Sequence, residues 1–480
     1  MSANASPTLV WFRQDLRLQD NPALQAALDR KRPVIPVYIW SPEEEGDWAP
    51  GGAQRWWIHR ALEHLKDELE KRDQQLVLRQ GGALEALLAL VEETGADRVV
   101  WNRRYEPPVT ARDTNVKSEL QDAGLEAESY NGSLLFEPWK VATGSGNPYK
   151  VYTPFWRNVK DRPVGEPVET DYHALKNQAY PGEVRSDSLD SLGLLPDVRW
   201  YDEMEACWTP SERSAQQRLK AFAKDEAKAY SERRNLPGDS GTSALSPYLH
   251  FGHISPRQIW REIMKTTPEG DGRTTYLKEI IWREFAYHVL FHFPDTPEAP
   301  LRPEFEDFPW ERDSEMLERW RKGLTGYPLV DAGMRQLWRE GWMHNRVRMV
   351  VASLLVKHLL QPWQEGARWF WDTLVDADLA SNTLGWQWAG GCGADAAPYF
   401  RIFNPITQSE KFDPEGTYIH RYVPELARLE VPHLHSPWEA PAHVLEAAEV
   451  RLGEDYPEPM IEHKAGRQRA LEAFAAVKKD

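Results

Sequence analysis

Apolar runs alternate with amphipathic stretches over the first 130 residues of the chain. Five runs are interpreted as strands: Thr8–Phe12, Val34–Trp40, Leu76–Leu78, Arg98–Trp101 and Glu126–Tyr130. Three stretches between them have the apolar spacing of helices: Gly52–Lys71, Ala83–Glu93 and Val109–Ala123. Repeated β–α units of this kind predict an α/β domain with an open, doubly wound parallel sheet. The G-x-G-x-x-G dinucleotide fingerprint does not follow the first strand, although a ligand can still bind at the carboxyl ends of such strands.

The alternation ends near Asn131, where a stretch rich in Pro, Gly, Asp and Ser begins that is typical of a long linker. From Ser211 onward helical spacing dominates, which predicts an all-α second domain. Ser246–Pro247 and Ser255–Pro256 each suggest a serine N-cap followed by proline at the first helical position. Gly333–Leu360 predicts one long helix or two joined helices. The predicted organisation is therefore an α/β domain at 1–131, a linker at 132–205 and a helical domain at 206–480.

Composition narrows the class of protein. The chain has 480 residues, of which 41% are hydrophobic and 28% charged, a composition typical of soluble globular proteins. Its apolar runs are too short for a membrane span, and its first residues do not resemble a secretory signal. Two cysteines cannot form a disulfide framework or a four-thiolate metal site. We therefore expect a cytoplasmic monomer with no membrane partner and no structural metal.

Charge and tryptophan content each leave two interpretations open. A formal net charge of −16 argues against nucleic acid as a partner, yet phosphate contacts require only a local basic surface. Five basic residues and one acidic residue lie between Gly333 and His358, which fits either such a surface or a solvated helix face. The 22 tryptophans are explained mostly by core packing, but they also permit chemistry that uses indole rings.

Three motifs could carry chemistry. Gly241–Pro247 places small hydroxyl residues beside a glycine at the start of a helix, which suits a phosphate but equally suits plain capping. Treated as part of one helix, Gly341–Met349 carries Asn345, Arg348 and Met349 on one face and Arg346 about 100° away. Such a helix could line a ligand and also reach outward, or it could be amphipathic with snorkelling arginines.

The third motif is the pair Asp376 and Asp378, separated by one small residue. Two such carboxylates could bind a metal, act as general bases or pair with an arginine. Because no histidines cluster nearby, Arg348 is the partner that the sequence favours.

Several collinear segments are similar to the photolyase–cryptochrome family, and the resemblance extends from about Thr8 to Phe474. The matching segments are Trp11–Arg17, Tyr327–Arg335, Gly341–Arg346, Ala397–Pro405 and Lys411–Asp413. The resemblance implies an N-terminal α/β domain, a long linker and a C-terminal helical domain that holds FAD. This is the same order as the one that the apolar pattern predicts.

Carried over residue by residue, the resemblance implies FAD contacts of two kinds: hydroxyl groups near the pyrophosphate, and side chains beside the isoalloxazine. Arg348 would pair with Asp376 beside the isoalloxazine, and Asn345 would face flavin N5. An amide at that position suits an anionic reduced flavin and favours repair over light sensing, because light sensors of the family tend to carry Asp or Cys there. The full set of implied FAD-binding residues is Tyr230, Thr242, Ser243, Leu245, Ser246, Asn345, Arg348, Asp376, Asp378 and Asn382.

The resemblance also implies a pocket for a cyclobutane pyrimidine dimer flipped out of DNA. Glu279, Asn345, Met349 and Trp388 would act on the dimer, and Trp282 and Trp388 would stack on its bases. Arg234 and Arg346 would grip the backbone at the mouth of this pocket. The chain lacks a matching second histidine after His344, which favours the cyclobutane dimer over the (6-4) photoproduct.

Trp386, Trp363 and Trp310 match the electron-transfer chain that reduces the resting flavin in the family. The implied repair reaction begins when light excites reduced FAD, which passes an electron to the dimer. The two inter-base bonds then break and the electron returns. An antenna chromophore is expected near Trp101–Pro107, with Glu106 as a contact. Arg104 stands where an acid commonly supports deazaflavin, so methenyltetrahydrofolate is favoured over 8-hydroxydeazaflavin or no antenna.

Two rival functions fit parts of the sequence. A cryptochrome-type photoreceptor would keep the flavin and the tryptophans but often carries a long tail, whereas this chain stops soon after a basic helical segment, His463–Lys479. A nucleotide-binding enzyme whose helical half binds a partner would contain no flavin. A visible absorption spectrum of the purified protein distinguishes this second rival from both flavoproteins.

Overall fold

A computed structural model describes residues 5–477. Its contacts group the chain into two compact units. Unit 1 comprises the chain up to Pro148, Phe155–Lys228 and Ser243–Pro294, and unit 2 comprises Tyr149–Pro154, Ala229–Thr242 and the chain from Asp295 onward. The predicted α/β domain, linker and helical domain at 1–131, 132–205 and 206–480 have other boundaries than these two units. The predicted domain boundaries therefore stay a prediction.

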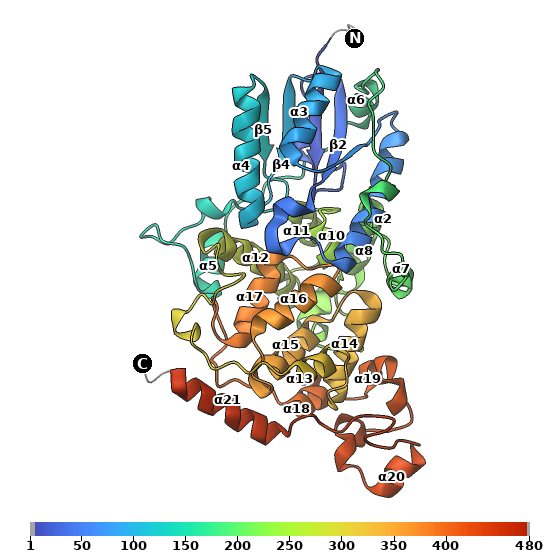
Figure 1. The fold of residues 1–480 in the computed structure, drawn as a ribbon, viewed down its shortest axis with the longest axis vertical. Coiled ribbons are helices and arrows are strands. Elements are labelled where there is room, and N and C mark those ends of the chain that lie inside the picture. Colours follow the sequence, from blue (N-terminus) through green and yellow to red (C-terminus); the bar gives the residue numbers. More distant parts are fainter. Residues whose placement is uncertain (1–4, 478–480) are drawn as a thin grey trace. The chain divides into compact units, whose positions relative to one another are not determined.

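Unit 1 contains a five-stranded parallel sheet in the order β3-β2-β1-β4-β5, so the α/β prediction is confirmed (Figure 1). The strands are β1 (Thr8–Phe12), β2 (Val34–Trp40), β3 (Val77–Gln80), β4 (Arg98–Asn102) and β5 (Glu126–Tyr130). Three of them, β1, β2 and β5, have the predicted bounds. The helices of this unit are α1 (Pro22–Leu28), α2 (Gly52–Glu70), α3 (Ala83–Thr94), α4 (Pro107–Asp122), α6 (Tyr172–Asn177), α7 (Asp202–Cys207), α8 (Glu212–Asp225), α10 (Ser246–His250), α11 (Pro256–Thr266) and α12 (Asp271–His292).

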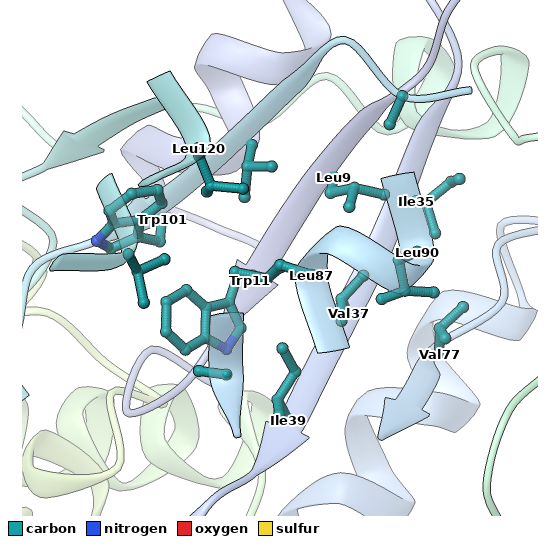
Figure 2. Close-up of a cluster of buried hydrophobic side chains, with 14 of the residues drawn as sticks. Leu9, Trp11, Ile35, Val37, Ile39, Val77, Leu87, Leu90, Trp101 and Leu120 are labelled. Carbon is teal, nitrogen blue, oxygen red and sulfur yellow. The ribbon is translucent and has the colours of Figure 1, made fainter. Parts of the chain in front are cut away.

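Alternation along the strands explains how the sheet is covered. Leu9 and Trp11 of β1 belong to a buried cluster with Leu87 and Leu90 of α3 and Leu120 of α4 (Figure 2). Successive side chains of a strand point to opposite faces, so the remaining β1 residues face the other layer, where α1 contacts β1 and β4. Helices on both faces make the sheet doubly wound, as predicted.

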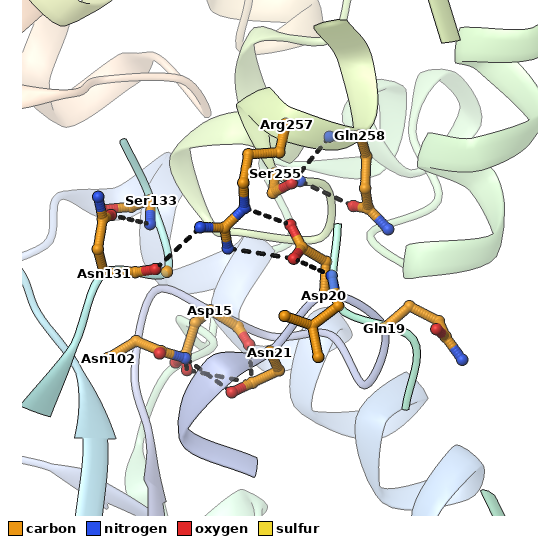
Figure 3. Close-up of polar contacts among 12 residues, drawn as sticks. Asp15, Gln19, Asp20, Asn21, Asn102, Asn131, Ser133, Ser255, Arg257 and Gln258 are labelled. Carbon is orange, nitrogen blue, oxygen red and sulfur yellow. Dashed lines mark hydrogen bonds and ion pairs between the residues drawn. The ribbon is translucent and has the colours of Figure 1, made fainter. Parts of the chain in front are cut away.

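The turn after β1 is fixed by a buried polar network within unit 1 (Figure 3). The Asn102 amide donates to Asp15 Oδ2 at 2.6 Å and to Asn21 Oδ1 at 2.7 Å. Arg257 of α11 forms an ion pair with Asp20, at 3.1 Å between Nη2 and Oδ1. The predicted N-cap at Ser255 is confirmed, and Ser255 forms a reciprocal capping box with Gln258. The N-cap predicted at Ser246 is wrong, because Leu245 occupies that position and Ser246 begins α10.

Unit 2 is helical, as predicted for the second half of the chain. Its helices are α9 (Tyr230–Arg233), α13 (Ser314–Arg321), α14 (Pro328–Glu340), α15 (Asn345–Ser353), α16 (Trp363–Thr373), α17 (Leu379–Gly390), α18 (Pro405–Phe412), α19 (Thr417–Tyr422), α20 (Ala442–Ala447) and α21 (His463–Val477). A further short helix, α5 (Tyr152–Val159), crosses the boundary between the units. None of the helices in residues 5–477 combines the length and the apolar composition that crossing a bilayer requires.

Within Gly333–Leu360 the chain forms two main helices, which is one of the two predicted alternatives. Asn345, Arg348 and Met349 share one helix, as predicted, but Gly341–His344 do not belong to it. Gly341 ends α14 in the left-handed region, with φ +64°. His344 then caps α15, where its Nδ1 accepts the Arg346 N–H at 3.2 Å. The turn at 341–344 therefore sets the first residue of α15, which is Asn345.

Glu284 is a fully buried carboxyl group on α12. Its Oε2 accepts the backbone N–H groups of Leu135 and Phe136 at 2.9 and 3.0 Å, and its Oε1 lies 3.8 Å from Arg283. Burial outweighs these favourable contacts and raises the pKa of Glu284 from 4.5 to about 7.

This raised pKa predicts a pH-dependent stability. The folded state holds the proton more tightly than the unfolded state, so the stabilisation is complete below pH 4.5 and disappears as the pH rises to about 7. Glu284→Gln removes this titration, and its free energy of unfolding relative to the native protein should rise by about 3 kcal/mol over that interval. Urea unfolding at several pH values measures the difference, with exposed Glu269→Gln as the matched control. Parallel profiles for Glu284→Gln and the native protein would contradict the prediction.

Candidate functional site

The predicted Arg348–Asp376 pair is present in unit 2. Arg348 Nη2 lies 3.0 Å from Asp376 Oδ1 and 2.9 Å from Oδ2, and its Nε donates to the Met343 carbonyl at 2.8 Å. The Asp376 side chain is 3% exposed and the Arg348 side chain 24%. The guanidinium is thus fixed from two sides, and the pair joins the start of α15 to the segment that precedes α17.

Helix α17 presents polar and aromatic side chains on one face. Asp378 caps the helix by accepting the Ser381 N–H at 2.7 Å. Asn382 follows four residues later, and its amide donates to the Ala367 carbonyl at 3.0 Å. Trp386 follows after four more residues and therefore lies on the same face. By contrast, Asn345 is exposed at the first position of α15.

The three candidate electron-transfer tryptophans all lie in unit 2. The Trp386 ring packs directly on α16, where a Cβ added at Gly366 would come within 2.1 Å of it. Trp363 begins α16, and its Cδ1 would lie 3.9 Å from a Cβ at Gly390, one turn beyond Trp386 on α17. Trp386 and Trp363 are buried, while Trp310 is half-buried beside Phe308, with 4.3 Å between their ring centroids. Two of the three indoles are thus buried, and the third, Trp310, is partly exposed.

The predicted lesion-binding residues divide between the units. In unit 1, Glu279 and Trp282 are three residues apart on α12, so they share a face of that helix. In unit 2, Trp388 is half-buried and packs on Phe403, with centroids 6.4 Å apart and planes at 28°. Met349 is half-buried on α15, one turn after Asn345.

The hydroxyl-rich segment is also divided between the units. In unit 1 the Tyr276 hydroxyl donates to Ser243 Oγ at 3.0 Å, Leu245 is buried and Ser246 is exposed. In unit 2, Tyr230 opens α9 and Thr242 ends the following loop. This loop lies close to α9, because a Cβ at Gly241 would approach the Arg233 carbonyl to 2.9 Å.

Two residues that sequence reasoning missed surround Arg346. Its Nη2 donates to Asn235 Oδ1 at 2.8 Å, and its guanidinium carbon lies 4.4 Å from the Phe412 ring centroid. Arg234, the other predicted residue at the mouth, is close enough for its charge to lower the pKa of Arg346, after the larger effect of burial. The structure thus brings Arg234 and Arg346 together, as predicted. Sequence spacing could not show that Asn235 and Phe412 contact Arg346.

At the carboxyl ends of β1, β2 and β4, the crevice of unit 1 has a volume of only about 20 Å³. Arg13, Arg104 and Arg112 line it. Glu106 does not line the crevice but is buried beside Arg104, and it accepts from Arg104 Nη2 at 3.1 Å and from the Tyr105 N–H at 3.0 Å. This space is sufficient for a water molecule but not for a flavin or a pterin.

Comparisons with known proteins cover the whole chain. Residues 8–172 match the DNA photolyase family, and residues 276–476 match the FAD binding domain of DNA photolyase. The deoxyribodipyrimidine photo-lyase of Agrobacterium fabrum is 48% identical over 484 residues, with 100% of each chain covered. Cryptochrome-2 of Arabidopsis thaliana is 38% identical, over 98% of this chain and 79% of the relative.

A comparison of folds also finds a photolyase. The crystal structure of a bacterial class III photolyase from Agrobacterium tumefaciens superposes with a TM-score of 0.95 at 47% identity, over 100% of this chain and 99% of that chain. The chain therefore belongs to the DNA photolyase and cryptochrome family and carries the FAD-binding domain of DNA photolyase.

Proposed function

We propose that this protein is a deoxyribodipyrimidine photolyase that repairs cyclobutane pyrimidine dimers in DNA with the energy of blue light. The observation that carries the proposal is the full-length match to a relative of that name, at 48% identity against 38% for a plant cryptochrome. We further propose that it acts as a monomer in the cytoplasm, with damaged DNA as its partner.

The donor set of the candidate site fits FAD. The guanidinium of Arg348 and the carboxylates of Asp376 and Asp378 supply a cation and acceptors for the polar edge of an isoalloxazine, and Thr242, Ser243 and Ser246 supply hydroxyls for a pyrophosphate. When bound, FAD supplies the light-absorbing group and the electron that opens the dimer. Trp386, Trp363 and Trp310 would deliver electrons from the protein surface to keep it reduced.

Two asparagines are candidates to contact the flavin ring, and the geometry favours Asn382. Its amide is oriented by the Ala367 carbonyl on the face of α17 that carries Trp386, whereas Asn345 is exposed. Asn382→Ala should therefore lower the molar ratio of FAD to purified protein clearly, and Asn345→Ala should lower it little. Absorbance at the flavin and protein maxima measures this ratio. A larger loss in Asn345→Ala would return the flavin contact to Asn345.

The lesion would be bound by residues that stack, accept hydrogen bonds and grip the backbone. Trp282 and Trp388 offer aromatic faces to the two pyrimidines, and Glu279 can accept hydrogen bonds from base edges. A dimer stacks poorly in the duplex, so it is cheaper to flip out than a normal pair of bases. Arg234 and Arg346 would hold the phosphates beside it.

The decisive experiment is a light-dependent repair assay. Purified protein with reduced flavin is incubated with single- and double-stranded oligonucleotides that carry one cyclobutane dimer, in blue light and in the dark. Repair only in the light is expected, and a matched oligonucleotide with a (6-4) photoproduct should stay unrepaired. Failure to repair the dimer in both kinds of DNA would refute the proposal and favour the photoreceptor, which the 38% match to a cryptochrome makes the second candidate.

We also propose methenyltetrahydrofolate as an antenna, with 8-hydroxydeazaflavin or no antenna as alternatives. The crevice lined by Arg13, Arg104 and Arg112 is too small for either chromophore. Elsewhere in unit 1, Trp139 is 47% exposed and lies near Arg103, whose guanidinium carbon is 5.8 Å from the ring centroid. An exposed indole can stack on a flat pterin, and the neighbouring cation can attract the carboxylates of the glutamate tail of a folate. Mass spectrometry of extracted chromophores identifies the antenna, and its loss in Trp139→Ala would support this location.

A further inference from the structure

Arg346 is held without a carboxylate. Its Nε and Nη2 both donate to the Oδ1 of Asn235, at 3.3 and 2.8 Å, and its guanidinium lies over the ring of Phe412. An amide oxygen and an aromatic face fix the direction of a guanidinium but carry no negative charge. Within residues 5–477, no carboxylate lies at ion-pair distance from Arg346.

Neighbouring arginines in unit 2 are paired differently. Arg233, which is two residues before Asn235, binds Asp239, with 2.6 Å between Nε and Oδ2. Arg348, two residues after Arg346, binds Asp376, and Arg335 binds Glu425 at 2.8 Å. Their charges are neutralised within the protein, whereas the charge of Arg346 is not.

The electrostatics around Arg346 favour an anion. Burial lowers the pKa of Arg346, and the like charge of Arg234 lowers it further. Arg234 itself lies over Tyr230, at 5.6 Å from the ring centroid. Arginine stays charged at neutral pH, so two guanidinium groups held near each other favour binding of a phosphate.

We propose that Asn235 and Phe412 are positioning residues that hold Arg346 for a DNA phosphate while leaving its charge uncompensated. The proposal rests on the proposed function only in taking DNA as the partner. The side chain is ordered before DNA arrives, which reduces the entropy lost on binding. A carboxylate in place of the amide would hold Arg346 equally well but would compete with the phosphate for its charge.

Asn235→Asp tests this difference directly, because it replaces an amide by a carboxylate of the same shape. Affinity is measured in the dark for a fluorescent oligonucleotide, with and without a dimer, over a range of salt concentrations. Binding of both oligonucleotides should weaken, and the slope of log K against log salt should become shallower by about 0.7–0.9, the loss of one phosphate contact. In the repair assay KM should rise while kcat at saturating DNA stays unchanged.

Two further variants separate charge from position. Gln468→Glu on α21 makes the same change in net charge at an exposed site and should leave both affinity and slope unchanged. Phe412→Leu removes the ring that orients Arg346 but keeps its charge, so affinity should fall while the slope stays near that of the native protein. Flavin absorbance checks that each variant is folded.

Results that overturn the role of Asn235 and Phe412 differ from results that refute dimer repair. Native affinity and native slope in Asn235→Asp would overturn the inference, and so would a native protein that does not bind DNA. If Asn235→Asp loses its flavin, Phe412→Leu decides, and unchanged affinity in that variant would overturn the inference. A protein that binds undamaged DNA in this Asn235-dependent way but repairs no dimer in light would refute only the proposed function.

Discussion

Replacing Arg348 by leucine is expected to yield a protein that purifies with little FAD and unfolds at a lower urea concentration than the native protein. The carboxylate of Asp376 is nearly fully buried and loses its cation in this variant. Breaking a buried ion pair from one side typically costs about 3–5 kcal/mol, because the remaining charge stays desolvated. Urea unfolding and the ratio of flavin to protein absorbance measure the two effects.

The double variant Arg348→Leu/Asp376→Leu separates stability from flavin binding. With both charges replaced by apolar groups, the desolvated carboxylate is gone and most of the lost stability should return. FAD should still be absent, because the cation and the acceptor proposed to contact it are both missing. Native flavin content in Arg348→Leu would contradict a role for this pair in the cofactor site.

Replacing Trp386 by phenylalanine should nearly abolish the reduction of oxidised flavin by light in the presence of an external reductant. Phenylalanine keeps an aromatic ring against Gly366 and Phe370, but it is not oxidised as readily as indole. Repair by protein whose flavin has been reduced chemically should be retained, because the tryptophans are not proposed to act on the dimer. Flavin absorbance during illumination measures the first effect and the repair assay the second.

Trp438→Phe is the matched control for this prediction. Trp438 is a half-buried indole of unit 2 that packs on Tyr327, and it does not belong to the proposed chain. Its replacement should leave light-driven reduction unchanged. Native rates of flavin reduction in Trp386→Phe would remove Trp386 from the electron path.

The sequence was most informative where structure depends on neighbours along the chain. The strands β1 and β2 have the predicted bounds, because their apolar runs are short and end at polar residues, and the less apolar β5 also has the predicted bounds. The sequence does not decide between one helix and two over Gly333–Leu360, because apolar residues occur within Gly341–His344. Helix α14 ends at the left-handed conformation of Gly341. The N-cap predicted at Ser246 is wrong because α10 begins one residue earlier than expected, which places both Ser246 and Pro247 inside the helix.

Sequence patterns could not predict most contacts between residues that are far apart along the chain. Asn235 and Phe412 meet Arg346 across 111 and 66 residues of chain. Phe412 lies in the matching segment Lys411–Asp413, but nothing in the sequence pairs either residue with Arg346. The arginines that fill the crevice of the sheet come from three separate segments, so the sequence could predict a crevice but not its small volume. The Arg348–Asp376 pair was predictable only because few alternative partners existed for the two acids.

The turn at 341–344 has a consequence for how this segment can vary among natural sequences. A helix rotates by 100° per residue, so beginning α15 one residue earlier or later would turn Arg348 away from Asp376 and Arg346 away from Asn235 together. Substitutions in the turn change one side chain, whereas an insertion or deletion changes every contact of the helix that follows. We therefore expect relatives to keep the length of this turn, together with the left-handed residue at 341 and the cap at 344.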